Sequence, residues 1–277
     1  MWNVIRYDLC VGLKKCYIRY IVLFVMVIIT CIHVDGIIYD NIEMRFCHAG
    51  FLNYIIYMFQ GIRPVSAGEL KEYGMPVFWV FYNIYILFVL GGYVSASLKI
   101  DRCQCFVRFG SRSRFIIGKY IYMLTGTLLY YICIYSAVLC HMFISRNIRW
   151  YEPAIGTPVN FFNIQIFPSI RYIIYAFVLT PLLSSSFYVS VCLLAEIYSR
   201  LMPGLIVISL YIISGIYANN RYNISSNTML CRNEYVMPEG MAVSNSLFIV
   251  CVAIAISVIA GIISIRHYEF IRGERNS

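Results

Sequence analysis

The stretch SNSLFIVCVAIAISVIAGIISI, residues 244–265, decides the fold class. It holds no charged residue and is long enough to cross the apolar core of a bilayer, which takes about 20 helical residues. Across the 277 residues, 61% are hydrophobic and 13% are charged, about half the charged share of a soluble domain. Five more runs have the same character, at roughly 18–38, 76–98, 116–143, 170–195 and 201–218. The sequence therefore predicts an all-α, polytopic integral membrane protein with six transmembrane helices in a single domain over residues 1–277.

The charged residues predict the orientation of these helices. If both termini are inside, the inner segments hold about two thirds of the 22 Lys and Arg residues, whereas more than half of the 13 acidic residues are outside. Because cytoplasmic loops carry an excess of Lys and Arg, we expect cytoplasmic N- and C-termini in a multi-pass protein of the cell membrane. The net charge of +9 also raises nucleic acid as a partner. We exclude it, because the basic residues lie between apolar runs, where they meet membrane lipids. The outer segments are then 39–75, 144–169 and 219–243.

Two short segments are expected at the membrane surface. In residues 1–17, Trp2, Ile5, Leu9 and Leu13 recur at helical spacing with polar residues between them, which indicates an amphipathic surface helix. It either anchors the chain or acts as an elbow helix that docks a partner, and the sequence favours neither reading. Residues 49–62 are apolar but too short to cross, so a re-entrant or interfacial element is expected there.

The sequence shows no catalytic or metal-binding pattern. The predicted spans are nearly without charge: Lys119 and Glu196 lie at span ends, where such side chains can snorkel toward water. His141 has no acidic residue at helical spacing, which favours an ordinary hydrogen-bonding role. The 11 cysteines form no framework, although a disulfide between Cys47 and Cys231 is open. We therefore expect neither an enzyme nor a metal site.

The inner loop KIDRCQCFVRFGSRSRFIIGK, residues 99–119, carries the strongest functional signal. It is a basic segment with aromatic residues set between the cations. One reading is a stop-transfer cluster that fixes topology. The other is a docking helix, whose apolar residues fill a groove on a soluble partner while Arg residues flank it. The loop is not a phosphate-binding loop, because that motif requires Gly where Ser113 stands and Ser or Thr where Tyr120 stands.

This layout resembles the permease subunit of a bacterial type-2 ABC exporter (ABC-2 family, type V exporter-like). That family has an N-terminal elbow helix, six spans, and a G/K-S-R-x-x-x-x-x-K-type run after span two. Arg108, Ser111, Arg112 and Lys119 hold the places of that run. The resemblance covers the whole chain in layout, and sequence detail is confined to residues 76–120. It implies that residues 99–115 form the helix that couples to a separate ATPase subunit.

The resemblance also implies partners and contact residues. Two copies of an ABC ATPase would bind ATP and Mg²⁺, while this chain binds no cofactor and pairs with a second, identical or different, permease subunit. A shorter contact is expected between spans four and five. Small re-entrant helices are common between spans five and six, although residues 219–243 are rich in Asn and Ser, which argues against them. The expected ATPase-coupling residues are Arg102, Phe106, Arg108, Phe109, Ser111, Arg112, Arg114, Glu196 and Arg200.

The composition of the spans favours an amphipathic or hydrophobic cargo, because they are rich in Tyr, Phe, Ser and Asn but poor in charge. A peptide, in bacteriocin-like export or immunity, is the first expectation. The alternative function is that of a non-transporting polytopic protein, an assembly factor or sensor subunit. The residues expected along a cargo path are Tyr82, Asn83 and Tyr85 in span two and Ser184, Ser185 and Ser186 in span four. Hydrogen bonding between helices of one subunit explains the same residues equally well.

Overall fold

The computed structural model describes residues 2–40, 48–62, 75–93, 111–150, 174–198, 201–217, 220, 222–234, 240 and 242–267. Every regular element within these ranges is a helix, as the sequence predicts. In chain order the elements are α1 (Trp2–Asp40), α2 (Phe51–Phe59), α3 (Val77–Leu90), α6 (Arg112–Ile144), the π-helix η2 (Ile174–Leu179), α8 (Thr180–Tyr198), α9 (Leu201–Tyr217), α10 (Ile224–Asn227), the 3₁₀-helix η3 (Leu230–Arg232) and α11 (Val243–His267).

Four of these helical stretches are long and apolar enough to cross a membrane. They are Leu9–Asp40, Arg112–Ile144, Ile174–Tyr198 and Val243–Ile265. This supports the assignment of the chain as a membrane protein. Helices α3 and α9 also fall at predicted spans but have only 14 and 17 residues. Six spans therefore stay a prediction, because two of the six helices are shorter than a perpendicular crossing requires.

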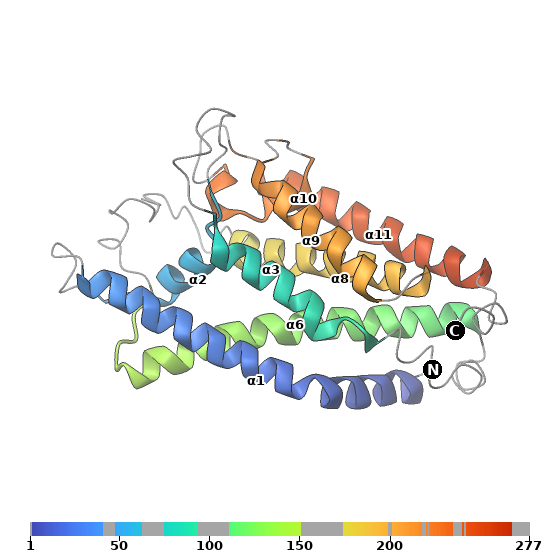
Figure 1. Cartoon of the computed structure of the whole chain (residues 1–277), viewed down its shortest axis with the longest axis horizontal. Coiled ribbons are helices and arrows are strands. Elements are labelled where there is room, and N and C mark those ends of the chain that lie inside the picture. The colour runs from blue at the N-terminus through green and yellow to red at the C-terminus, as the bar shows by residue number, and fades with distance from the viewer. Residues whose placement is uncertain are drawn as a thin grey trace.

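The long helices run back and forth along one axis of the molecule. Figure 1 shows the starts of α1, α6 and α9 at the same end as the last turns of α3, α8 and α11. We call this the inner end, following the orientation that the charges predict, and the opposite end the outer end. Helices α2, α10 and η3 lie toward the outer end (Figure 1). Helix α8 is central: it packs against α11, α9, α6 and α3.

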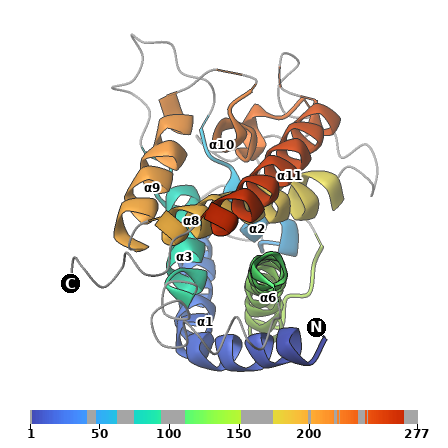
Figure 2. The ribbon, with the colours of Figure 1, turned by 90° about the vertical axis from the view of Figure 1, so that its right-hand side faces the viewer.

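The N-terminal segment belongs to the same helix as the first span, and its place at the membrane surface stays a prediction. The helix is continuous from Trp2 to Asp40, whereas we expected an element over 1–17 distinct from the span. Figure 2 shows that the first part of α1 runs across the bottom of the view, while the rest turns and recedes from the viewer. At Gly12, within this N-terminal segment, α1 lies close to α6, because a Cβ atom on Gly12 would lie 2.4 Å from the Tyr122 ring.

Residues 49–62 and the segment after α9 both contain short helices whose side chains are largely buried. Helix α2 has nine residues and rises only about 14 Å, so it does not cross a bilayer by itself. The Asn- and Ser-rich segment after α9 holds α10 and η3, although its composition argued against helices. The physical reason is capping: the Asn223 Oδ1 atom accepts hydrogen bonds from the amides of Ser225 and Ser226 at the start of α10. Cys231 lies in η3, and its possible disulfide partner Cys47 lies outside the described residues.

Hydroxyl groups join the long helices across an otherwise apolar core. The Tyr82 hydroxyl of α3 lies 2.8 Å from Thr30 Oγ1 of α1, and the Tyr130 hydroxyl of α6 donates to the Tyr82 carbonyl at 2.8 Å. Another such pair joins Ser190 of α8 to Ser257 of α11, at 2.8 Å. Such bonds hold membrane helices together, because lipid offers the hydroxyls no alternative partner.

Removing the hydroxyl group of Tyr188 in the core should stabilise the protein. The Tyr188 side chain is fully buried, and its hydroxyl, although close to Ser225 and Thr228, makes no hydrogen bond of good geometry among the described residues. A buried, unsatisfied polar group costs about 1–3 kcal/mol. We therefore expect Tyr188→Phe to raise the melting temperature of the purified protein. In contrast, Tyr131→Phe should lower it, because the Tyr131 hydroxyl lies 2.7 Å from Ser185 Oγ. Equal losses in both variants would show that the Tyr188 hydroxyl is bonded after all, for example to water.

Candidate functional site

The inner end of α3 breaks off at a glycine pair that leads into the basic loop. We expected this helix to continue to residue 98, but it ends at Leu90. Gly91 is extended, with φ −66° and ψ 155°, and Gly92 has φ 84°, a left-handed conformation that favours glycine. The helix therefore ends in a sharp turn, and residues 94–110, which lead into the basic loop and include its first half, lie outside the described residues.

Two other helices hold this turn. The Arg19 Nη1 group of α1 donates to the carbonyls of Phe88 and Val89 at 2.6 and 3.0 Å. A cation at this place satisfies the last carbonyls of α3 and opposes the negative end of its dipole. From α8, the Glu196 carboxylate accepts a hydrogen bond from the Gly92 amide at 2.8 Å. The turn that leads toward the basic loop is thus tied to both α1 and α8.

The far side of the loop returns to the same place through α6. The Ser111 hydroxyl caps this helix by accepting a hydrogen bond from the Arg114 amide at 3.3 Å. Two turns later, the Lys119 ammonium lies 4.5 Å from the centre of the Tyr93 ring, just past the glycine turn. The two ends of the loop therefore converge on one group of side chains, which we call the inner cluster: Arg19, Tyr93, Lys119 and Glu196.

Lys119 and Glu196 correct an expectation. At span ends they were predicted to snorkel toward water, yet Lys119 is 1% exposed and Glu196 is 3% exposed. The surrounding helices enclose both charges, which only tertiary packing could reveal. Enclosing charged side chains is costly, so in a membrane protein they mark function more often than stability.

The predicted coupling residues divide into three groups. Arg102, Phe106, Arg108, Phe109 and Arg200 lie outside the described residues. Arg112 and Arg114 are exposed at the start of α6, as docking residues must be, and Ser111 is the helix cap. Glu196 faces inward, so it can act on a docked partner only through the turn that it holds. Coupling through these residues stays a prediction.

The residues predicted along a cargo path are all engaged within the chain. Tyr82 contacts Thr30, the Asn83 amide donates to the Trp79 carbonyl, and the Tyr85 hydroxyl donates to the Arg19 carbonyl. In α8, the hydroxyls of Ser184 and Ser186 donate to carbonyls of their own helix, and Ser185 pairs with Tyr131. Of the six, only Tyr85 is not buried. Their role in a path stays a prediction.

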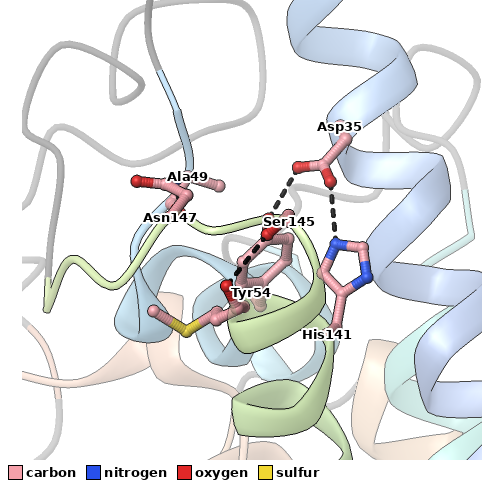
Figure 3. Close-up of polar contacts among 7 residues, drawn as sticks. Asp35, Ala49, Tyr54, His141, Ser145 and Asn147 are labelled. Atoms are coloured by element: carbon pink, nitrogen blue, oxygen red, sulfur yellow. Dashed lines mark hydrogen bonds and ion pairs between the residues drawn. The ribbon is translucent and has the colours of Figure 1, made fainter.

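A second polar cluster lies at the outer end, around Asp35 of α1 (Figure 3). One carboxylate oxygen accepts a hydrogen bond from the Tyr54 hydroxyl of α2 at 2.6 Å, and the other lies 2.8 Å from His141 Nε2 of α6. Burial, and then the bond to Asp35, raises the pKa of Tyr54, so its phenol remains a donor. This outer cluster seats α2 on the two helices, helped by a hydrogen bond from the Asn147 amide to the Ala49 carbonyl.

Sequence reasoning missed the acidic partner of His141. Spacing within one helix cannot reveal this pair, because Asp35 belongs to a different span from His141. The sequence did hold one signal: Asp35 and His141 each lie near the outer end of an apolar run. When the two helices pack side by side, both residues therefore lie at the same height along the helix axes. Among the described residues, no three His, Cys, Asp or Glu side chains gather as a metal site.

Arg232 of η3 is the third buried charge. Its guanidinium donates to the Ile62 carbonyl after α2 at 3.0 Å, and to the carbonyls of Gly215 and Ile216 at 2.8 and 2.7 Å. It also contacts the Ser226 hydroxyl of α10. Burial lowers the pKa of Arg232, although arginine remains charged in proteins. One side chain thus joins α2, α9 and α10 at the outer end.

Comparison of the chain with family models, with curated proteins and with solved structures finds no match.

Proposed function

We propose that this chain is the transmembrane permease subunit of an ATP-driven exporter of the ABC-2 type. It dimerises with an identical or different permease and couples at its inner end to two copies of a separate ATPase. One observation carries the proposal: the two described segments that flank the basic loop, the glycine turn after α3 and the first turns of α6, meet at the inner cluster, which joins α1, α3, α6 and α8. A force applied to the loop would reach four helices at once.

The inner cluster supplies a route for that force. The glycine pair lets the loop change direction relative to α3 without straining a side chain. The Glu196 bond to Gly92 passes the displacement to α8, the central helix, and Arg19 passes it to α1. Exposed Arg112 and Arg114 offer the cationic rim that a docking surface needs.

The proposed cargo is an amphipathic or hydrophobic molecule, with a membrane-active peptide first, in bacteriocin-like export or immunity. The support is compositional: the core joins its helices through uncharged hydroxyl groups, while the buried charges lie toward the two ends. A bacterial cell membrane is the proposed location.

One observation favours a second candidate, a non-transporting assembly factor or sensor subunit. All six residues predicted along the cargo path make hydrogen bonds within the chain. A protein that only recruits a partner through its basic loop needs no path, so the internal bonding is what this class would show.

The test is co-purification with an ATPase encoded beside this gene. We expect wild-type protein to retain the ATPase, and Arg108→Glu or Arg112→Glu to reduce the retained amount at least about tenfold, because charge reversal opposes the docking field. Arg146→Glu is the matched control, since Arg146 is exposed at the outer end. Wild-type protein that retains no ATPase, or reversed variants that retain all of it, would contradict the proposal. Retained ATPase without cargo-stimulated hydrolysis would favour the recruiting function.

A further inference from the structure

The outer start of span four departs from α-helical geometry. Residues Ile174–Leu179 form a π-helix that runs directly into α8 at Thr180. A π-helix is rare and occurs mostly as a short interruption, frequently at a functional position. A π-helix bonds residues five apart instead of four. One side chain follows the same separation: the Thr180 hydroxyl donates to the carbonyl of Tyr175, five residues earlier, at 2.9 Å.

Pro181 explains why the regular helix cannot continue through this place. Proline has no amide hydrogen to donate to the carbonyl four residues earlier, which is that of Phe177, and its ring collides with that carbonyl. The π-helix moves the preceding turns away from the proline. In lipid, a carbonyl released in this manner must receive a hydrogen bond from elsewhere in the protein.

Two tyrosines of α6 supply bonds at this break. The Tyr135 hydroxyl donates to the Phe177 carbonyl at 2.7 Å. One turn earlier on α6, the Tyr131 hydroxyl lies 3.1 Å from the Pro181 carbonyl and 2.7 Å from Ser185 Oγ. Because Tyr131 and Tyr135 are four residues apart, they present both hydroxyls from one face of α6. One contact lies on each side of the break.

We propose that span four has a movable joint at Phe177–Pro181, and that Tyr131 and Tyr135 of α6 lock it in the conformation seen here. When the two phenolic bonds are released, η2 reorients relative to α8 while the rest of α8 stays packed against α9 and α11. The Phe177 carbonyl accepts from Tyr135 in the arrangement seen here, and it loses that donor in the second arrangement that the joint requires. The joint requires no assumption about an ATPase partner.

Hydrogen exchange of the purified protein in lipid nanodiscs tests the lock. In Tyr135→Phe we expect the amides of residues 176–183 to exchange about tenfold faster, the change that loss of one net hydrogen bond produces. Amides elsewhere in α8 and in α11 should keep their rates. Tyr130→Phe is the matched control: Tyr130 is another tyrosine of α6 that donates to a backbone carbonyl, but that carbonyl belongs to the unbroken helix α3.

A second substitution separates a joint from a merely supporting contact. Pro181→Ala restores an amide that can donate to the Phe177 carbonyl, so the Tyr135→Phe effect should disappear in that background. The joint is excluded if Tyr135→Phe leaves exchange over 176–183 unchanged, if it accelerates exchange in all helices alike, or if its effect persists when combined with Pro181→Ala. Should Tyr135→Phe fail to fold, Pro181→Ala alone gives a second test: the restored amide should slow exchange over residues 176–180 relative to the wild type, and unchanged rates there would exclude the joint.

Discussion

Arg232→Met should lower the free energy of unfolding by about 3–5 kcal/mol, because it removes a hydrogen-bonded charge from a buried network. The side chain is 6% exposed and holds the carbonyls of Ile62, Gly215 and Ile216. Methionine fills much of the same volume but donates to none of them. The last turn of α9 and the exit of α2 would then keep buried carbonyls whose donor is gone.

The measurement is thermal unfolding in detergent, followed with a thiol-reactive dye. Several of the cysteines are buried, Cys16, Cys31 and Cys192 among them, so the dye reports their exposure. For a chain of this size we expect the melting temperature to fall by roughly 10 °C. The melting temperature of Arg232→Lys should lie between those of the wild type and Arg232→Met, because lysine keeps the charge but lacks the planar set of guanidinium donors. Arg146→Met, an exposed arginine near the same end, should change little. A melting temperature for Arg232→Met equal to that of Arg146→Met would show that the network does not stabilise the outer end.

The positions of the long helices could be read from the sequence because hydropathy is a local property. Each of the six apolar runs coincides with a helix, including the uncharged 244–265 within α11. The end of α3 shows the limit of that method. The run to residue 98 is apolar enough to continue, but Gly91 and Gly92 end the helix once Arg19 and Glu196 are present to bond its last turn. A hydropathy average carries no information on which residues of other helices will contact the end of α3.

The candidate sites were harder to predict for the same reason. Asp35 and His141 are 106 residues apart and meet only because α1 and α6 pack side by side. Lys119 was expected to reach water, and it is instead covered by Tyr93 and Phe115. In contrast, exposure of Arg112 and Arg114 at the start of α6 follows from their place in a basic segment at the end of a span. Exposed charged residues can be predicted from the sequence, whereas the burial of a charged residue depends on contacts between distant segments.

Glu196→Leu should disconnect the basic loop from α8 while leaving the docking surface in place. The substitution removes the acceptor of the Gly92 amide, a charge-assisted bond at 2.8 Å, and the loss of such a buried partner costs about 1–3 kcal/mol. If α8 receives its displacement through this bond, the Leu variant should bind the ATPase normally but lose most of the change in ATP hydrolysis that the wild-type permease produces. Arg112→Glu should fail one step earlier, at binding itself.

Glu196→Gln distinguishes the bond from the charge. Glutamine has nearly the same shape and keeps a carbonyl oxygen that can accept from Gly92, so it should retain most of the coupling if the hydrogen bond is what transmits the displacement. If Gln behaves as Leu does, the negative charge matters more than the bond, and the buried cation of Lys119 becomes the first group to examine as its counterpart. Measuring bound ATPase and its hydrolysis rate in the same preparation separates these cases. A Leu variant with wild-type binding and wild-type stimulation would place the transmission elsewhere, with the contact of Arg19 at the end of α3 as the next step in the route.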